Sequence, residues 1–318
     1  MRRLLACLWG MMLLVSSCHK DIDVFEPIDL DQGNIERFFD AIQSNPFVAT
    51  WNAAEEHIIL TPNNSQIIIP ANVLVRPDGV KVSGTVQANI IEMADKGSLV
   101  RNRVQTLTGT GDSLLESELV LSIQIYQEGT LLQIEPGQSI RVLSPLVIYA
   151  PNLKLFLGTE TAIRPLYWVD SGNAIGIQPA EMVDPTQNRI VEGIEIITHQ
   201  LGWISCAKII EQQASSDFSV VCLELPLGFN LKNTAAFLVM QDFNTIVPLN
   251  ETGEEGQFIL CKGHLPSSFK TEVLVVAEAE EGEYLFGRKF AIISENLTIN
   301  IVPERAVLSD IIQTLEEL

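Results

Sequence analysis

Short apolar runs separated by turn residues follow one another through most of the chain and limit the folds open to it. In Val82–Ile91 small or apolar residues alternate with more polar ones, which is the period of a half-buried strand. Pro77-Asp78-Gly79 and Pro136-Gly137 supply tight turns between runs. Parallel βαβ units would need helical patterns between the strands, and none appears, so we predict an antiparallel β-sandwich or barrel-like domain. The strands predicted in this part are His57–Leu60, Gln66–Ile69, Val82–Ile91, Leu119–Tyr126, Leu131–Ile134 and Ile140–Val142.

The second half of the chain contains another strand series. Between Pro145 and about residue 200 the prolines become frequent and the pattern loosens, which indicates a connector with strands at Leu153–Leu157, Pro165–Val169 and Ile194–Thr198. After it, the spacing of the apolar runs is typical of an Ig-like sandwich. The strands predicted there are Phe218–Glu224, Ala235–Met240, Gln257–Cys261, Glu272–Ala277, Tyr284–Ile293 and Leu297–Val302.

Short helices are predicted near both ends of the folded part. Near the N-terminus, apolar residues recur with the spacing of one helix face, at Ile35, Phe38, Phe39 and Ile42. Asp31 or Asn34 can cap this helix, and Asn45-Pro46 ends it. Near the C-terminus, Pro303 and Glu304 open a helix. Its apolar face is formed by Val307, Ile311, Ile312 and Leu315.

We therefore expect a mainly β protein with two antiparallel β-sandwich domains and short N- and C-terminal helices. The first domain, with its helix and the connector, takes residues 31–200, the Ig-like sandwich takes 201–302, and the last helix takes 303–318. A chain of 318 residues with 47% hydrophobic residues can fill two such cores.

The chain begins with a basic pair, Arg2-Arg3, followed by the apolar stretch Leu4–Val15. A membrane-spanning helix needs roughly 20 apolar residues, so this shorter stretch indicates a signal peptide. The next residues, Val15-Ser16-Ser17-Cys18, resemble the lipobox of bacterial lipoproteins. The resemblance implies that residues 1–17 are cleaved, that Cys18 is the lipid attachment site, and that the chain is anchored in the outer membrane. The alternative is an ordinary secretory leader with a chance cysteine.

Residues 18–30 lack periodicity and are interpreted as a tether. Within it, His19-Lys20-Asp21-Ile22-Asp23 resembles the export signal of surface-exposed lipoproteins in Bacteroidota. That signal implies the cell-surface face of the membrane, whereas a plain solvated tether is equally compatible with the periplasmic face.

Three stretches together resemble a group of uncharacterised Bacteroidota surface and periplasmic lipoproteins whose first domain is a ZU5-like β-sandwich. The resemblance spans about residues 60–290. It implies a fold and a compartment, and no catalytic residues. Thr106–Ser113 departs from the pattern of that group. The matching stretches are Ile67–Leu74 with Gly79 and Val82–Val86, then Leu114–Ser117 with Gly129 and Ile134–Ile140, then Leu201–Cys206.

Charge limits the partners. The formal charge is −20, and without Arg2 and Arg3, the only charged residues before Cys18, it becomes −22. Such a field repels phosphate backbones, so nucleic acid is not an expected partner.

Three cysteines remain after Cys18, so at most one disulfide forms within the chain. They are Cys206, Cys222 and Cys261, and no Cys-x-x-Cys pair indicates a zinc or redox motif. Cys222 lies in an apolar run, where a small buried side chain is expected. A bridge from Cys206 to Cys222 or to Cys261 would fit an oxidising compartment, and the sequence does not choose between these two pairings.

No catalytic, cofactor-binding or metal-binding residues are predicted. Ser205-x-x-Lys208 and Ser267-x-x-Lys270 match the Ser-x-x-Lys spacing of penicillin-binding enzymes, but neither pair lies on a predicted helix and no partner motif follows. The acidic run Glu278–Glu283 lacks the spacing of a calcium loop and is interpreted as an exposed hairpin loop. The histidines are far apart in the chain, at His19, His57, His199 and His264.

Asp112-Ser113-Leu114 is similar to the O-glycosylation sequon of Bacteroidota, which makes Ser113 a candidate modification site. For the whole protein we expect a lipid-anchored, non-enzymatic binding or scaffolding module with a protein or glycan ligand. One alternative is a surface hydrolase or glycan-processing accessory whose carboxylates converge only in the fold. Another is a subunit of an outer-membrane assembly.

Overall fold

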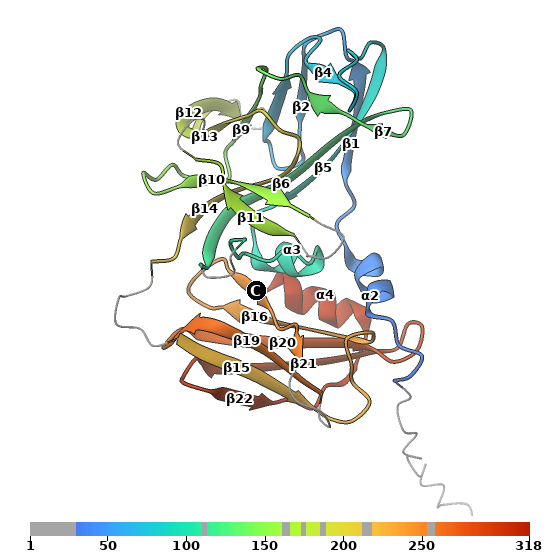
Figure 1. The fold of residues 1–318 in the computed structure, drawn as a ribbon, viewed down its shortest axis with the longest axis vertical. Helices are drawn as coiled ribbons and strands as arrows, with labels where there is room; N and C mark the ends of the chain where they lie inside the picture. The colour runs from blue at the N-terminus through green and yellow to red at the C-terminus, as the bar shows by residue number, and fades with distance from the viewer. Residues whose placement is uncertain are drawn as a thin grey trace, which may run out of the picture.

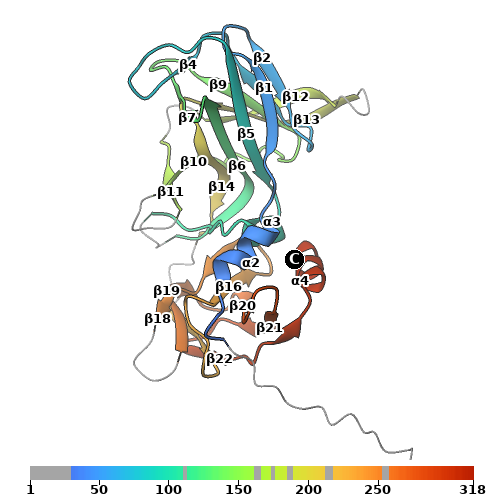
Figure 2. The same ribbon diagram turned by 90° about the vertical axis from the view of Figure 1, so that its right-hand side faces the viewer.

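The computed structural model shows a mainly β protein: in the part of the chain that the structure describes, 53% of the residues are in strands, which form several antiparallel sheets, and there are three short helices. This confirms the predicted β-rich class. Two β-rich bodies lie one above the other, with the helices between them (Figures 1 and 2). The leader, Cys18 and all of the tether except Leu30 lie outside the described residues. The structure describes residues 30–109, 113–160, 166–172, 176–184, 189–211, 218–252 and 258–318.

The first body comprises β1 to β14 and contains two large sheets. The seven-stranded sheet has the order β1-β5-β6-β14-β10-β11, with β7 added to β6. Its strands are β1 (Phe47–Asn52), β5 (Thr85–Met93), β6 (Leu115–Gln127), β7 (Thr130–Leu131), β10 (Lys154–Thr159), β11 (Tyr167–Asp170) and β14 (Gly202–Ile209). The five-stranded sheet has the order β12-β13-β9-β3-β2. Its strands are β2 (His57–Leu60), β3 (Gln66–Ile69), β9 (Ile140–Ser144), β12 (Ile177–Asp184) and β13 (Arg189–Thr198).

Apolar side chains from both large sheets form the core of the first body. Val86 and Leu121 come from one sheet, and Ile67, Val142 and Ile194 come from the other. A small two-stranded sheet, β4 (Leu74–Val75) and β8 (Gln133–Ile134), adds Leu74 and Ile134 to this core. Alternate residues of strands such as β5 and β6 point into it, as the two-residue period predicts.

The second body comprises β15 to β23. One sheet has the order β18-β19-β15-β22, and the other has the order β17-β16-β20-β21-β23. The strands of the first sheet are β15 (Phe218–Leu225), β18 (Glu251–Thr252), β19 (Phe258–Pro266) and β22 (Leu297–Asn300). Those of the second are β16 (Thr234–Met240), β17 (Ile246–Pro248), β20 (Lys270–Glu278), β21 (Tyr284–Ile292) and β23 (Glu304–Ala306). The pairing of β15 with β22 is parallel, which departs from the purely antiparallel expectation.

The three helices and the two bodies share a further apolar core. The helices are α2 (Ile35–Ile42), α3 (Lys96–Arg101) and α4 (Leu308–Glu316). Phe38 and Phe39 of α2 contribute to this core together with Leu115 of the first body and Leu274 of the second. Its continuity makes the junction between the two bodies a buried contact and not a loose linker.

Hydrogen bonds cross the junction as well. The Thr106 hydroxyl donates to the Ile246 carbonyl at 3.0 Å, and the Thr245 hydroxyl donates to the Leu115 carbonyl at 2.8 Å. All four residues are buried. Satisfied buried hydrogen bonds fix the relative position of the two bodies more tightly than apolar packing does by itself.

The predicted N-terminal helix is confirmed residue by residue. Ile35, Phe38, Phe39 and Ile42 are all buried, and the Asn34 side chain caps the helix by accepting from the Glu36 N–H at 3.1 Å. This helix was expected to belong to the first body, but it also packs on β20 of the second.

The predicted C-terminal helix starts later than expected. Glu304–Ala306 form the edge strand β23, and α4 begins at Leu308. A proline can precede either a helix or an edge strand. Here the residues after Pro303 pair with β21 and therefore form a strand. Near its end, α4 approaches α3 so closely that a Cβ on Gly97 would lie 1.9 Å from the Leu315 carbonyl oxygen.

The predicted start of the second domain at residue 201 is wrong. Gly202–Ile209 form β14, which pairs with β6 and β10 in the first body. The chain enters the second body only with β15. Local sequence cannot reveal this, because the pairing partner of a strand is chosen by contacts far away in the chain.

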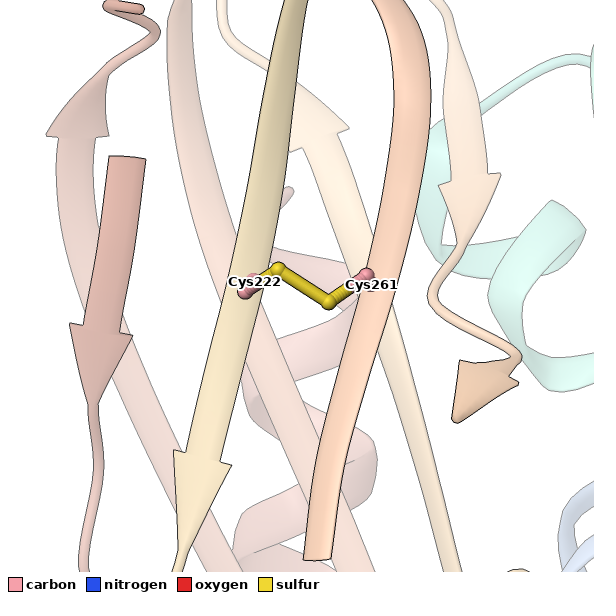
Figure 3. Close-up of a disulfide and its surroundings, with 2 residues drawn as sticks. All are labelled: Cys222 and Cys261. Atoms are coloured by element: carbon pink, nitrogen blue, oxygen red, sulfur yellow. A yellow bond between two sulfur atoms is a disulfide. The ribbon is translucent and has the colours of Figure 1, made fainter. Parts of the chain in front are cut away.

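The disulfide also differs from both predicted pairings, which involved Cys206. Cys222 and Cys261 face each other across β15 and β19, with their Cα atoms 4.1 Å apart (Figure 3). Cys206 is a buried free thiol in the core of the first body. The two errors have one cause: once β14 is assigned to the first body, Cys206 lies beyond the reach of the other two cysteines.

Candidate functional site

The structure separates most residues that the sequence singled out. Ser113 is half-buried just before β6, where its N–H donates to the Thr108 hydroxyl at 3.3 Å, while Asp112 of the same sequon lies outside the described residues. His57 stacks on Trp51 in the first body, and the His199 ring contacts the Gln138 carbonyl. Among the described residues no group of three or more His, Cys, Asp or Glu side chains could hold a metal ion.

The first Ser-x-x-Lys pair lies on the strand β14, at a position where the sequence predicts no helix. The Ser205 hydroxyl is buried and lies 3.0 Å from the Ser117 hydroxyl. The Lys208 ammonium donates to Glu118 and pairs with Glu116, and the hydrogen bond to Glu118 raises the pKa of Lys208. A lysine base in a Ser–Lys enzyme needs a lowered pKa, so this pair is not arranged for that chemistry.

The sequence predicts an exposed loop for the acidic run Glu278–Glu283, but its first residue is buried. Glu278 is 1% exposed, accepts from Arg37 Nε at 2.9 Å, and accepts from the Asn34 N–H at 3.1 Å. Glu280, Glu281 and Glu283 are exposed. The run therefore begins with a structural carboxylate that holds the start of α2 against β20.

One surface has the features of a binding site: the hairpin formed by β12 and β13. It projects from the first body (Figure 2). Where the hairpin leaves the core, a hollow of about 440 Å³ lies between its two strands and the loop after β9. The hollow is lined by Ile148, Tyr149, Pro179, Ala180, Glu181, Glu192 and Gly193.

Side chains on that inner face follow the strand period. Nearest the core, Pro179 lies opposite Ile194, then Glu181 lies opposite Glu192, and Val183 lies opposite Ile190 nearest the tip. Val183 and Ile190 are 53% and 68% exposed, and Ile148 across the hollow is 82% exposed. We call the residues that make up this surface the hairpin face: Ile148, Tyr149, Glu181, Val183, Ile190 and Glu192.

The hairpin face carries an unbalanced charge. Neither Glu181 nor Glu192 has an ion pair or hydrogen bond among the described residues, although the two are directly opposite each other. Like charges in that position repel. On the other face of the same hairpin, Glu195 accepts from Arg141 and Gln178, and these bonds lower its pKa although burial acts in the opposite direction.

The outer edge of β12 is also open. It is the last strand of its sheet, and no described strand pairs with its far side. The Ile197 N–H donates to the Gly176 carbonyl at 3.1 Å, so Gly176 and the alternate residues that follow it direct their backbone groups toward β13. Pro179, Glu181 and Val183 therefore direct theirs outward. Proline fits an outward position because it has no N–H to donate.

A second hollow, of about 490 Å³, lies beside the turn between β13 and β14. Amide side chains from Gln124, Gln133 and Gln200 line it, together with Leu131 and Leu201. Amides that both donate and accept suit hydroxyl-rich ligands, but among the described residues no Phe, Tyr or Trp side chain lines this hollow to stack on a sugar ring.

The carboxylates Glu181 and Glu192 bear on the hydrolase alternative, because they are a pair of acids that meet in a hollow. Glycoside hydrolysis needs two acids in different environments, so that one stays protonated while the other is ionised. Here both side chains are exposed to water. This arrangement favours attraction of a cation over acid–base catalysis.

The chain matches no protein-family model, and no curated protein shows significant similarity to it. No helix in the described part of the chain is long and apolar enough to cross a membrane.

Proposed function

We propose that this protein is a lipid-anchored, non-enzymatic module of the bacterial cell envelope that binds a partner protein. The hairpin face carries the proposal: exposed aliphatic side chains surround a free pair of carboxylates on a projecting hairpin. Monomeric surfaces usually scatter their apolar side chains, and a contiguous exposed group indicates an interaction site. A rigid body that presents such a face suits binding or scaffolding.

The proposed location is the outer membrane, with anchoring through lipid on Cys18. The disulfide between Cys222 and Cys261 supports a compartment outside the cytoplasm, since disulfides persist where the environment is oxidising. For the fold we propose a ZU5-like sandwich for the first body and an Ig-like sandwich for the second, in keeping with the Bacteroidota lipoproteins that the sequence resembles. Membership of an outer-membrane assembly would be one form of the same function.

Protein is the proposed ligand class over glycan. The exposed side chains of the hairpin face are mostly aliphatic and acidic, whereas sugar-binding surfaces rely on aromatic rings and amides. The amide-lined hollow beside β14 is where a glycan ligand would bind if the protein has one.

The proposal is tested in cells by site-specific cross-linking. A photo-reactive residue in place of Ile190 should trap one discrete protein adduct, whereas the same residue in place of Val302, which is 72% exposed in the second body, should not. Adducts at both positions, or at neither, would contradict a binding role for the hairpin face.

Anchoring is tested in the same cells with Cys18→Ala. Wild type should fractionate with the outer membrane, and the variant should lose that association because no lipid can be attached. Protease treatment of intact cells then reports which face of the membrane carries the body. An unchanged membrane fraction for the variant would overturn the proposed anchor.

A further inference from the structure

We propose that the free edge of β12 takes up an extended, cationic segment of the partner protein as an additional β-strand. The inference rests on the proposed function and specifies the chemistry of the partner. Two independent features of the hairpin support it, one in the backbone and one in the side chains.

The backbone feature is the outward direction of the Glu181 and Val183 peptide groups. Their N–H and C=O groups have no strand partner among the described residues. The bond from the Ile197 N–H to the Gly176 carbonyl shows which residues of β12 face β13. Glu181 and Val183 alternate with those residues, so their peptide groups face the open edge of the sheet. An open edge with free peptide groups is the template on which extended peptides add to a sheet. Beyond Pro179, which cannot donate, these two residues provide the available N–H groups.

The side-chain feature is the pair of carboxylates next to that edge. Glu181 and Glu192 form a pair of opposite residues that share no backbone hydrogen bond. In antiparallel sheets the side chains of such pairs lie closer together than those of hydrogen-bonded pairs, so the repulsion between these two carboxylates is stronger. A lysine or arginine side chain from an added strand, placed beside Glu181 on the same face, would relieve this repulsion. Charge complementarity therefore selects a basic residue at that position.

Neighbouring positions of the added strand follow from the period of two. The residues two positions before and two positions after the basic residue would point to the same face of the sheet. They would lie next to Pro179 and Val183, and Ile190 lies opposite Val183 on β13. Both neighbours favour apolar side chains. The predicted segment has the pattern apolar, any, basic, any, apolar.

A second copy of this chain does not fit the same edge. The chain has a formal charge of −20, and two β12 edges brought together would add a further pair of glutamates to the two already present. Inward-facing charge is a known means of preventing edge-to-edge association. The same carboxylates thus discourage self-pairing and attract a cationic partner.

The test uses synthetic peptides and the detergent-solubilised full chain. One fluorescent peptide alternates valine and threonine around a central lysine, and a second peptide replaces that lysine with glutamate. We expect the lysine peptide to bind at least about tenfold more tightly, with a preference that weakens as salt is raised. Equal affinities, or no binding of the lysine peptide, would overturn the inference.

Variants separate the two features. Glu181→Gln with Glu192→Gln should reduce the preference for lysine to less than about threefold, since the charges that select it are gone. Glu280→Gln with Glu281→Gln makes the same charge change in the exposed β20–β21 loop and should leave the preference unchanged. A loss of preference in both double variants would show that only the overall charge matters, which also contradicts the inference.

Val183→Pro tests the backbone feature, because it removes an outward N–H and leaves the bonds to β13 in place. It should weaken binding of both peptides, with an unchanged melting temperature as evidence of folding; unchanged binding would contradict strand addition. If no peptide binds while cross-links at Ile190 persist in cells, the binding function stands and this partner chemistry is wrong. If both fail, the proposed function fails as well.

Discussion

Carboxylates have opposite roles in the two bodies of this molecule. In the second body Glu272 and Glu278 are 2% and 1% exposed, and each accepts from an arginine. On the hairpin of the first body Glu181 and Glu192 are exposed and lack any such donor in the described chain. A buried carboxylate must be paired to be tolerated, so the first pair serves the fold. The exposed pair costs stability, and a partner can recover that cost.

The junction and the hairpin differ in their apolar residues in the same way. Phe38 of α2 is buried between the bodies, with its ring 5.4 Å from the Tyr284 ring, whereas Ile190 on the hairpin is mostly exposed. Both are large hydrophobic side chains, but only the first contributes to stability through burial. The comparison predicts where substitutions will unfold the protein and where they will only affect binding.

Phe38→Ala should have the largest effect on stability. Truncating a buried phenylalanine typically costs about 3–5 kcal/mol, because apolar contact is lost and a cavity remains. Ile190→Ala, the control on the hairpin, should change the free energy of unfolding by less than about 0.5 kcal/mol. Urea denaturation of both variants measures this, and similar costs would refute the contrast between junction and hairpin.

Replacing both disulfide cysteines, with Cys222→Ala and Cys261→Ala together, should rank next. The bridge closes a segment with a sequence separation of 39 residues, and its loss typically costs about 2–4 kcal/mol. The melting temperature of wild type should fall when reductant is added, while that of the double variant should not respond. A reductant response in the double variant would point to a different redox-sensitive group.

Glu278→Gln should destabilise the attachment of α2 to β20. The substitution weakens the acceptor for both Arg37 and the Asn34 N–H, and hydrogen bonds to a charged group typically contribute about 1.5–3 kcal/mol. Because Arg37 is 39% exposed and can be hydrated, we expect the lower end of that range. Hydrogen exchange of the α2 amides should accelerate, and unchanged protection would show that the pair does not hold this helix.

The smallest effect should come from the two faces of the hairpin. The pKa of Glu195 is lowered in the folded state, so its stabilisation is present at neutral pH and is lost as the pH falls through the folded pKa. Glu195→Gln should therefore cost under about 1 kcal/mol at neutral pH, a difference that disappears in acid. Glu181→Gln should leave the free energy of unfolding unchanged or raise it by roughly a few tenths of a kcal/mol, because it removes a repulsion between two carboxylates. Unfolding curves at two pH values distinguish these outcomes, and the reverse order would refute the assignment of the two faces.

Local patterns in the sequence predicted much of the secondary structure. The face of α2, its Asn34 cap and strands such as β2 and β3 follow from residue spacing and from side chains close in the chain. Local patterns do not predict α3 or the outer part of the β12–β13 hairpin. α3 is only six residues long, and the segment around Pro179 and Pro185 was interpreted as a connector.

Residue spacing alone predicts a chain rich in β-strands with short helices, because the periods of two and 3.6 residues depend on nearest neighbours in the chain. The fold, through pairing between distant strands, places β14 in the first body and joins Cys222 to Cys261. It also decided that Glu181 and Glu192 meet on an open edge while Glu278 is buried. Each of these outcomes depends on which strands pair across long sequence separations, and the free energy of that choice is spread over the whole core.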